Sequence, residues 1–186
     1  MSNLPNEGDP RLEFLRAMRS CHPDWMATGR VTFGGSLSWE LWKTRYFLPI
    51  LRPNLEAGWA ACARHDARAW QEIDRSIDQA LPSDLAERSR KAGALLANGF
   101  RPPTAEKLWA RITQEIAAGR QPGHLATVMA MRAATFSISP HLALGCYLLV
   151  EAKGGWGAEA EIQWWDLVDD CLSSTTAQAG PIFRIA

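Results

Sequence analysis

Apolar residues recur at intervals of three and four along most of the chain, the spacing that places them on one face of an α-helix. The clearest stripe lies between Asp66, a residue type that favours a helix start, and the breaking pair Pro82-Ser83. Its members are Trp70, Ile73, Ile77 and Leu81. Residues 31–33, Val-Thr-Phe, are the one short segment with a β-like pattern. The pattern therefore predicts an all-α fold.

Proline and glycine mark where several of the predicted helices begin and end. One helix is expected over residues 37–47 and should end near Pro49, after which Pro53 is expected to open the next helix. Two later helices are expected to stop at Gly99 and Gly119, because glycine readily adopts the left-handed conformation that ends a helix.

Two consecutive segments are apolar nearly all round, residues 124–136 and residues 140–153. A helix that is apolar on every side is expected to be buried by its neighbours. A last amphipathic helix is predicted over residues 158–172. The expected architecture is a single-domain orthogonal helical bundle of about eight helices around two buried central helices.

Length and composition fit one globular domain. The chain has 186 residues, of which 47% are hydrophobic and 22% charged, and both fractions are close to those of globular proteins. We expect a single helical domain over residues 1–186. Residues 1–8 and 173–186 are expected to be flexible tails or tails that become ordered on a partner.

The charge balance and the cysteines narrow the class of protein. Twenty Lys and Arg residues balance twenty Asp and Glu residues, which argues against a nucleic-acid binder because phosphate neutralisation favours a basic excess. No stretch approaches the ~20 apolar residues of a membrane span, and the first ten residues lack the apolar core of a signal peptide. The four cysteines form no C-x-x-C pair. We expect a cytoplasmic protein with reduced thiols.

The titratable residues form no pattern typical of a catalytic, cofactor or metal site. None of the four histidines is spaced from another ligand as in known metal motifs. They are His22, His65, His124 and His141. Asp166, Asp169 and Asp170 form one acidic cluster, for which a solvated helix face is the simpler interpretation. We therefore predict no catalytic residue, no cofactor and no metal ligand, and hence a protein that is not an enzyme.

Tryptophan is unusually frequent, with nine Trp against two Tyr. Such rings are costly to leave exposed, so some should lie in the core and others on a contact surface. The neighbours Trp164 and Trp165 cannot both face one core. One of them is therefore a candidate residue for binding a partner protein.

Several short motifs occur together in the middle and C-terminal helices. The first group is Leu48-Pro49-Ile50-Leu51, Ala60-Ala61, Asp66, Ala69, Ile73-Asp74, Leu85, Ser89, Gly93 and Leu95-Leu96. The second is Pro122-Gly123-His124 ahead of an alanine-rich helix over residues 126–134, then Ile138-Ser139-Pro140, Ala143-Leu144, Tyr147-Leu148 and the ending Pro181-Ile182-Phe183-Arg184. Together these motifs resemble the urease accessory protein F (UreF) family.

The resemblance implies an all-α, non-enzymatic accessory protein of nickel metalloenzyme maturation. Proteins of this family dimerise and bridge a nickel-delivering GTPase and a second accessory protein to apo-urease. Ser89 and Gly93 would then be close-packing positions, and His124 and Tyr147 polar groups inside or beside the central helices. Phe183 and Arg184, at the end of the chain, would be a partner-binding element that becomes ordered on assembly.

Two other functions remain open at this level. The chain could be a helical subunit of a multiprotein or nucleoprotein complex, with a basic patch on its surface. The patch would comprise Arg88, Arg90, Lys91, Arg101 and Arg111. It could also be a small helical enzyme whose pocket is lined by His124, His141 and one of Asp169 and Asp170.

Overall fold

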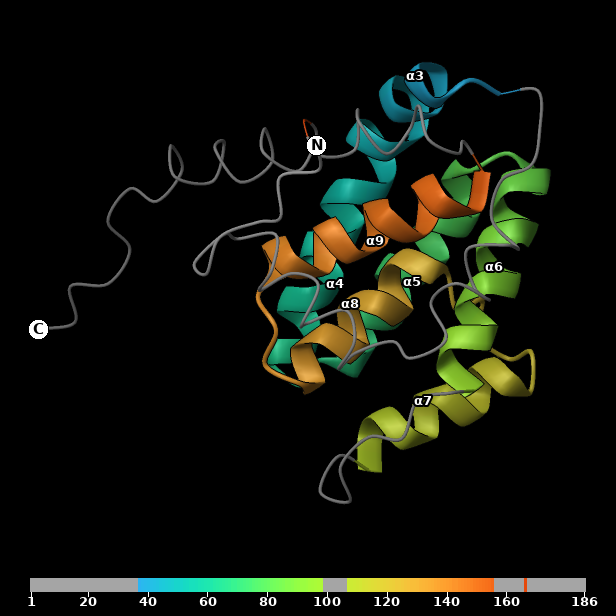
Figure 1. Ribbon diagram of the computed structural model, residues 1–186. Helices are drawn as coiled ribbons and strands as arrows, with labels where there is room; N and C mark the ends of the chain where they lie inside the picture. Colours follow the sequence, from blue (N-terminus) through green and yellow to red (C-terminus); the bar gives the residue numbers. More distant parts are fainter. Residues whose placement is uncertain (1–36, 99–106, 156–165, 167–186) are drawn as a thin grey trace, which may run out of the picture.

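The computed structural model describes residues 37–98, 107–155 and 166, and within them the fold is all helical, without a strand (Figure 1). The first helix is continuous and has three parts, α3 (Trp39–Trp42), η1 (Lys43–Leu51) and α4 (Arg52–Ala63). The other five are α5 (Ala67–Ala80), α6 (Ser83–Asn98), α7 (Lys107–Ala117), α8 (Leu125–Thr135) and α9 (Pro140–Gly155). The expected β-like segment, the predicted helix over residues 158–172 and both tails lie outside the described residues.

The predicted helix end near Pro49 is wrong. The helix runs through this proline as the π-helix η1 and continues into α4 without a break. In an α-helix the ring of Pro49 would collide with the carbonyl group four residues earlier, and the wider π turn gives it room. The next turn is bonded accordingly, since the Arg52 amide donates to the Phe47 carbonyl and the Asn54 side chain donates to the Ile50 carbonyl at 2.7 Å.

Helix starts follow the capping residues read from the sequence. The Asp66 carboxylate accepts a hydrogen bond from the Ala69 amide at 3.0 Å, so its predicted role as the cap before α5 is confirmed. Ser139 caps α9 in the same way, accepting from the Leu142 amide at 3.3 Å. Side-chain oxygens thus replace the missing carbonyl partners at these helix starts.

Three helices end with the same hydrogen-bond pair around one residue of positive φ. That residue is His65 after α4, Gly119 after α7 and Ser137 after α8, with φ values of 56°, 70° and 55°. After α8, the Ser137 amide donates to the Ala134 carbonyl at 3.0 Å and the Ile138 amide to the Ala133 carbonyl at 2.8 Å. These paired bonds satisfy the last carbonyls and turn the chain sharply. The predicted stop at Gly119 is confirmed.

Helix α8 lies at the centre and contacts α4, α5, α6 and α9, while α7 lies at the edge against α6 (Figure 1). Every residue from Leu125 to Ala133 is buried, as its sequence predicts. Small residues allow the close approach, since a Cβ added at Gly58 of α4 would meet the Ala130 Cβ at an ordinary 3.6 Å. The α9 side chains Ala143, Leu144 and Leu148 are buried as well.

The start of the first helix packs on α9 through a run of aromatic rings. Trp39 and Trp42 stack at 4.9 Å between centroids, and Phe47 stacks on both Trp42 and Tyr147, at 5.4 and 6.2 Å. The rings of Trp42, Phe47 and Tyr147 are almost completely buried. Part of the tryptophan excess therefore lies in the core, as expected.

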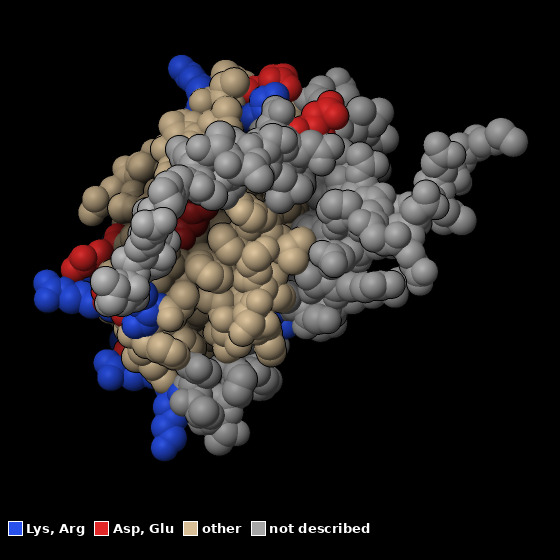
Figure 2. Space-filling model, turned by 90° about the vertical axis from the view of Figure 1, so that its left-hand side faces the viewer, with Lys and Arg blue, Asp and Glu red and all other residues tan. Residues whose placement is uncertain are grey.

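The side of the molecule on which α9 begins presents a broad uncharged surface, with Lys and Arg to its left and lower left in Figure 2. Residues 133–150, which include the start of α9, contain no Asp, Glu, Lys or Arg. Of the helices in the described part of the chain, none combines the length and the apolar character needed to cross a bilayer.

Candidate functional site

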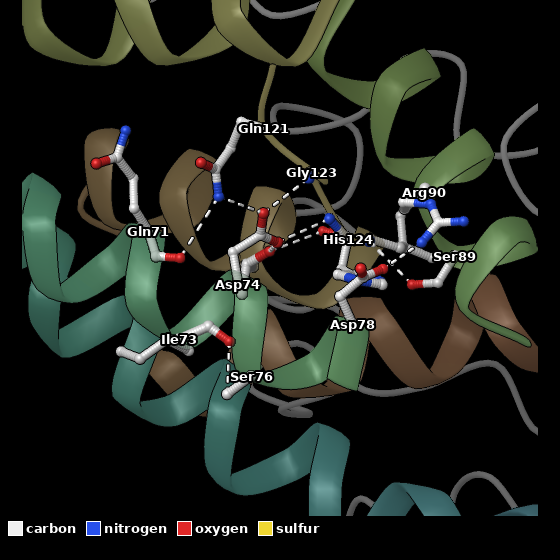
Figure 3. A network of polar contacts seen from close by, with 12 residues as sticks. Gln71, Ile73, Asp74, Ser76, Asp78, Ser89, Arg90, Gln121, Gly123 and His124 are labelled. Carbon is white, nitrogen blue, oxygen red and sulfur yellow. Dashed lines mark hydrogen bonds and ion pairs between the residues drawn. The ribbon is translucent and has the colours of Figure 1, made fainter. Parts of the chain in front are cut away.

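The start of α8 is held by one buried carboxylate, that of Asp74 on α5 (Figure 3). Its Oδ2 accepts from the Gly123 amide at 2.7 Å, and its Oδ1 accepts from the His124 amide at 2.8 Å. These amides lie where helix N–H groups lack partners and where the helix dipole is positive. A carboxylate therefore complements this end of α8 in both hydrogen bonding and charge.

Two side chains complete the shell around this carboxylate. The Gln121 amide donates to Oδ2 at 2.8 Å, and the Thr127 hydroxyl donates to Oδ1 at 2.5 Å. Gln121, Thr127 and Asp74 are all buried. We call Asp74 with its four donors, on Gln121, Gly123, His124 and Thr127, the Asp74 clamp. A charged acid can be accommodated here because four donors replace its lost hydration.

Helix α6 approaches the same turn at Ser89 and Gly93. The Ser89 hydroxyl accepts from the Leu125 amide at 3.3 Å. A Cβ at Gly93 would overlap the Gly123 carbonyl oxygen and lie 2.8 Å from the His124 carbonyl carbon. Position 93 therefore has no room for a side chain, and the backbones of α6 and the α8 start are in direct contact.

Gly123 itself has a φ of 67°, and a Cβ there would meet Ile116 Cγ2 at 2.5 Å. Glycine is required at this turn both for the left-handed backbone and for the contact with α7. The link between α7 and α8 is thus fixed from three sides, by Asp74 of α5, by Gly93 of α6 and by Ile116 of α7.

The His124 ring lies beside the clamp and faces a second acid. It is fully buried, and its Nε2 lies 3.3 Å from the Asp78 Oδ1, a close contact without hydrogen-bond geometry. Asp78 in turn pairs with Arg90 of α6 (Figure 3). Burial lowers the pKa of His124, while the charges of Asp74 and Asp78 oppose that effect. The imidazole is consequently neutral at pH 7.

Tyr147 belongs to a different cluster, beneath the aromatic rings of the first helix. One turn further along α9 lies Glu151, and both side chains are buried. Neither side chain has a hydrogen-bond partner of standard geometry among the residues that the structure describes, although the Tyr147 hydroxyl and the Glu151 carboxyl lie close enough to interact. Burial raises the pKa of Glu151 to about 8, opposed by the Tyr147 hydroxyl, and also raises the pKa of Tyr147.

The structure brings together three of the predicted packing positions, Ser89, Gly93 and His124, and places Tyr147 apart from them. The four predicted partner-binding residues lie outside the described residues. These are Trp164, Trp165, Phe183 and Arg184.

The residues of the proposed basic patch are largely paired. Arg90 pairs with Asp78, Lys91 with Glu87 at 2.6 Å, and Arg111 with Glu115 at 3.1 Å, while Arg101 lies outside the described residues. Among the residues that the structure describes, no three potential ligands gather around a common point for a metal ion.

Asp74 is the functional candidate whose role the sequence reasoning missed, although Ile73-Asp74 was among the motifs that carried the resemblance. One signal was available: Asp74 lies four residues after Trp70 and three before Ile77, on the buried stripe of α5. An acidic residue on such a stripe requires donors, and donors are abundant only at a helix start or in a polar pocket.

One comparison with known proteins identifies a family for this part of the chain. The UreF family model matches residues 45–157, which is more than half of the chain and includes every residue of the Asp74 clamp. Members of that family are accessory proteins of urease maturation. No curated protein and no solved structure matches the chain.

Proposed function

The chain belongs to the UreF family, and we propose that it is a non-enzymatic scaffold in the maturation of urease, a nickel enzyme. It would act through protein–protein contacts in the cytoplasm, without a cofactor of its own. Its partners would be the other accessory proteins, among them a GTPase that delivers nickel, and the client apo-urease. A second copy of the chain is a further proposed partner.

The observation that carries this proposal is the family match over residues 45–157. The match begins within η1 and extends to the end of α9, so it includes all of the buried helix α8. Motifs of small and polar residues in this range, such as Ser89, Gly93 and Gly123, have defined packing roles in the structure.

The Asp74 clamp supports a scaffold role in physical terms. A protein that bridges others needs surfaces held in constant relative positions, because each interface depends on shape complementarity. The clamp ties α5 to the start of α8 through one carboxylate, and the backbone contact at Gly93 ties α6 to the same turn. The outer faces of these helices therefore keep their relative placement.

The proposal is tested by deleting the gene in its own host and measuring urease activity in extracts. We expect activity to fall at least about tenfold, with urease subunits still present but low in nickel. Re-expression of the tagged chain should restore activity and recover the accessory proteins by affinity purification.

A matched pair of variants makes this test specific for the folded scaffold. Asp74→Ala should fail to restore activity, whereas Asp66→Ala, which removes a single helix cap, should restore most of it. A deletion strain with unchanged urease activity and nickel content would contradict the proposed function.

A further inference from the structure

We propose that η1 is a conformational switch between two registers of the first helix, where a register is the set of residues that faces the core. In the π form, Trp39 and Trp42 face the core. When the π turns shorten to α turns, the N-terminal part of the helix rotates and both indole rings turn outward. The inference rests on the proposed function in one respect, that rings presented in this way serve a partner protein.

The buried positions of the first helix break the spacing of an α-helix at one point. Trp39 and Trp42 are buried at an interval of three, and Phe47, Leu51 and Leu55 are buried at intervals of four. Between Trp42 and Phe47, however, the interval is five. An interval of five matches the hydrogen bonds of the π turns, which join residues five apart. The π form is therefore what places the two groups of buried side chains on one face.

A second stripe in the same segment has the unbroken spacing of an α-helix. Leu41, Thr44, Leu48, Leu51 and Leu55 recur at alternating intervals of three and four. In a continuous α-helix, with about 100° per residue, Leu41 and Leu48 would lie within about 40° of Leu55. The sequence therefore contains two faces that could meet the core, one for each kind of turn.

The structure buries the first of these faces and leaves the leucines of the second in solvent. Leu41 and Leu48 are 41% and 40% exposed, although both are large and apolar. In a continuous α-helix that kept Leu55 inward, Trp39 and Trp42 would lie about 140–160° away from it, on the outer side. The change of register thus replaces two buried indole rings by two leucines, so that each form has an apolar face to bury.

Two prolines hold the switch in its π form. In one uninterrupted α-helix, the rings of Pro49 and Pro53 would each collide with the carbonyl group four residues earlier. Both carbonyl groups, those of residues 45 and 49, lie within η1, whose wider turns give the rings room. Both prolines are exposed. They therefore act on the backbone rather than through packing in the core.

The contact that changes between the two forms is a stack of rings. Trp42 stacks against Tyr147 of α9 with 6.5 Å between the ring centroids. Polar bonds in the segment are local, since Lys43 pairs with Glu40 and the Thr44 hydroxyl donates to the Glu40 carbonyl. A rotation of the segment carries these local bonds with it and exchanges the ring contacts. Elements with two discrete packings of this kind are the usual basis of conformational switches.

The test removes both prolines and measures the exposure of the rings in the full-length chain. The variant is Pro49→Ala combined with Pro53→Ala. Labelling with fluorotryptophan gives a fluorine NMR signal for each of the nine tryptophans, and single replacements of Trp by Phe assign the signals. A soluble gadolinium chelate then broadens the signals of rings that reach the surface.

The double variant should expose the rings of the first helix alone. We expect the broadening of the Trp39 and Trp42 signals to rise at least about threefold over the parent. Trp70 and Trp109 are as deeply buried as Trp42 in the structure, but they belong to α5 and α7. Their signals should keep the broadening of the parent and show that the rest of the protein remains folded.

Two further variants make the result specific. Pro82→Ala changes an exposed proline just before α6 and should leave all the signals as in the parent. Leu48→Glu adds a charge to the face that only the α form buries, at a position that is exposed in the π form. Added to the double variant, Leu48→Glu should return the Trp39 and Trp42 signals to the parental broadening.

Rings that stay as protected in the double variant as in the parent would overturn the switch, because η1 would then accommodate the prolines without selecting a register. Broadening of Trp70 and Trp109 along with the other two would overturn it as well, since the α form leaves the other helices folded. A double variant that Leu48→Glu does not reverse would overturn the leucine face. All of these measurements use the purified chain, so their failure and the failure of the urease deletion test are distinguishable.

Discussion

Asp74 and Glu151 are two fully buried acids in the same small core, and their surroundings are opposite. Asp74 accepts hydrogen bonds from four donors at the start of α8. Glu151 lies one turn from Tyr147 on α9, and apart from the hydroxyl of that tyrosine its oxygens have no donor nearby in the described part of the chain.

The difference shows that the donors around a buried carboxyl decide what it does for the fold. With four donors, the ionised carboxylate becomes a structural joint, because its charge is compensated by oriented dipoles. Without such a shell of donors, the buried carboxyl retains its proton at neutral pH, and its ionisation opposes folding. The first acid connects helices, while the second makes the stability of the protein depend on pH.

The largest expected effect comes from breaking the joint. Asp74→Ala leaves two backbone amides, a hydroxyl and an amide side chain buried without their acceptor, and should lower the free energy of unfolding by roughly 3–5 kcal/mol. Urea denaturation followed by circular dichroism measures this loss. The control Asp66→Ala removes one exposed cap and should cost about 1 kcal/mol. Equal losses in both variants would show that the clamp has no special weight.

The next effect tests the backbone contact on the other side of the joint. Gly93→Ala forces a methyl group against the Gly123 carbonyl and should cost about 2–3 kcal/mol. Gly58→Ala, in α4, meets Ala130 only at ordinary contact distance and should be neutral or stabilising by about 0.5 kcal/mol. Thermal denaturation of the two variants measures this difference. A Gly93→Ala protein as stable as its parent would contradict the close packing.

Glu151 should make the free energy of unfolding depend on pH. Its pKa is about 8 in the folded protein against 4.5 for the free group, so the folded state binds the proton more tightly. The contribution of Glu151 to the free energy of unfolding is therefore fully present at low pH, and it is lost as the pH rises from 4.5 through 8. Between pH 7 and 8.5 we expect the free energy of unfolding to fall by about 1 kcal/mol.

Glu151→Gln should abolish this fall, as measured by urea denaturation at the two pH values. Glu72→Gln is the matched control, since Glu72 is 60% exposed and pairs with Arg68 across one helical turn. It should retain the pH dependence of the parent. A Glu151→Gln protein that loses stability as the parent does would assign the effect to another group.

The smallest effect concerns the ion pair next to His124. Asp78 and Arg90 join α5 to α6 with side chains 36% and 38% exposed, so a double-mutant cycle should give a coupling of about 0.5–1 kcal/mol. The more exposed pair of Arg68 and Glu72, with side chains 89% and 60% exposed, should give about 0.3 kcal/mol. A coupling energy between Asp78 and Arg90 no larger than this would show that their ion pair does not help to hold α5 and α6 together.

Local patterns predicted most of the helices because their causes are local. The stripe of α5, its Asp66 cap and the all-apolar face of α8 can be read from spacing and residue type alone. The prediction failed at Pro49, where a helix breaker is accommodated by a π turn. The same turn places Phe47 on Tyr147 of α9, a contact between residues one hundred apart that no local pattern contains. The number of helices and the orthogonal packing stay predictions.

The site was harder to predict because its bonds cross between distant segments. Ser89, Gly93 and His124 entered through the family resemblance, which preserved the residues without giving the geometry that relates them. Asp74 is separated from Gly123 and His124 by 49 and 50 residues. Its acceptor role appears only when α5 lies beside the start of α8, whereas the stripe that contains it reads as an ordinary amphipathic helix.

The same sequence separation has a consequence for the order of events during synthesis. When α5 leaves the ribosome, the amides that Asp74 needs have not yet been made, and about fifty further residues take roughly 3–10 s to add. Throughout that interval the carboxylate must remain hydrated, and of the neighbouring helices α4 and α8 only α4 can yet pack on the apolar stripe. The core around Asp74 can therefore close only after Gly123 and His124, the two residues that precede α8, have been synthesised.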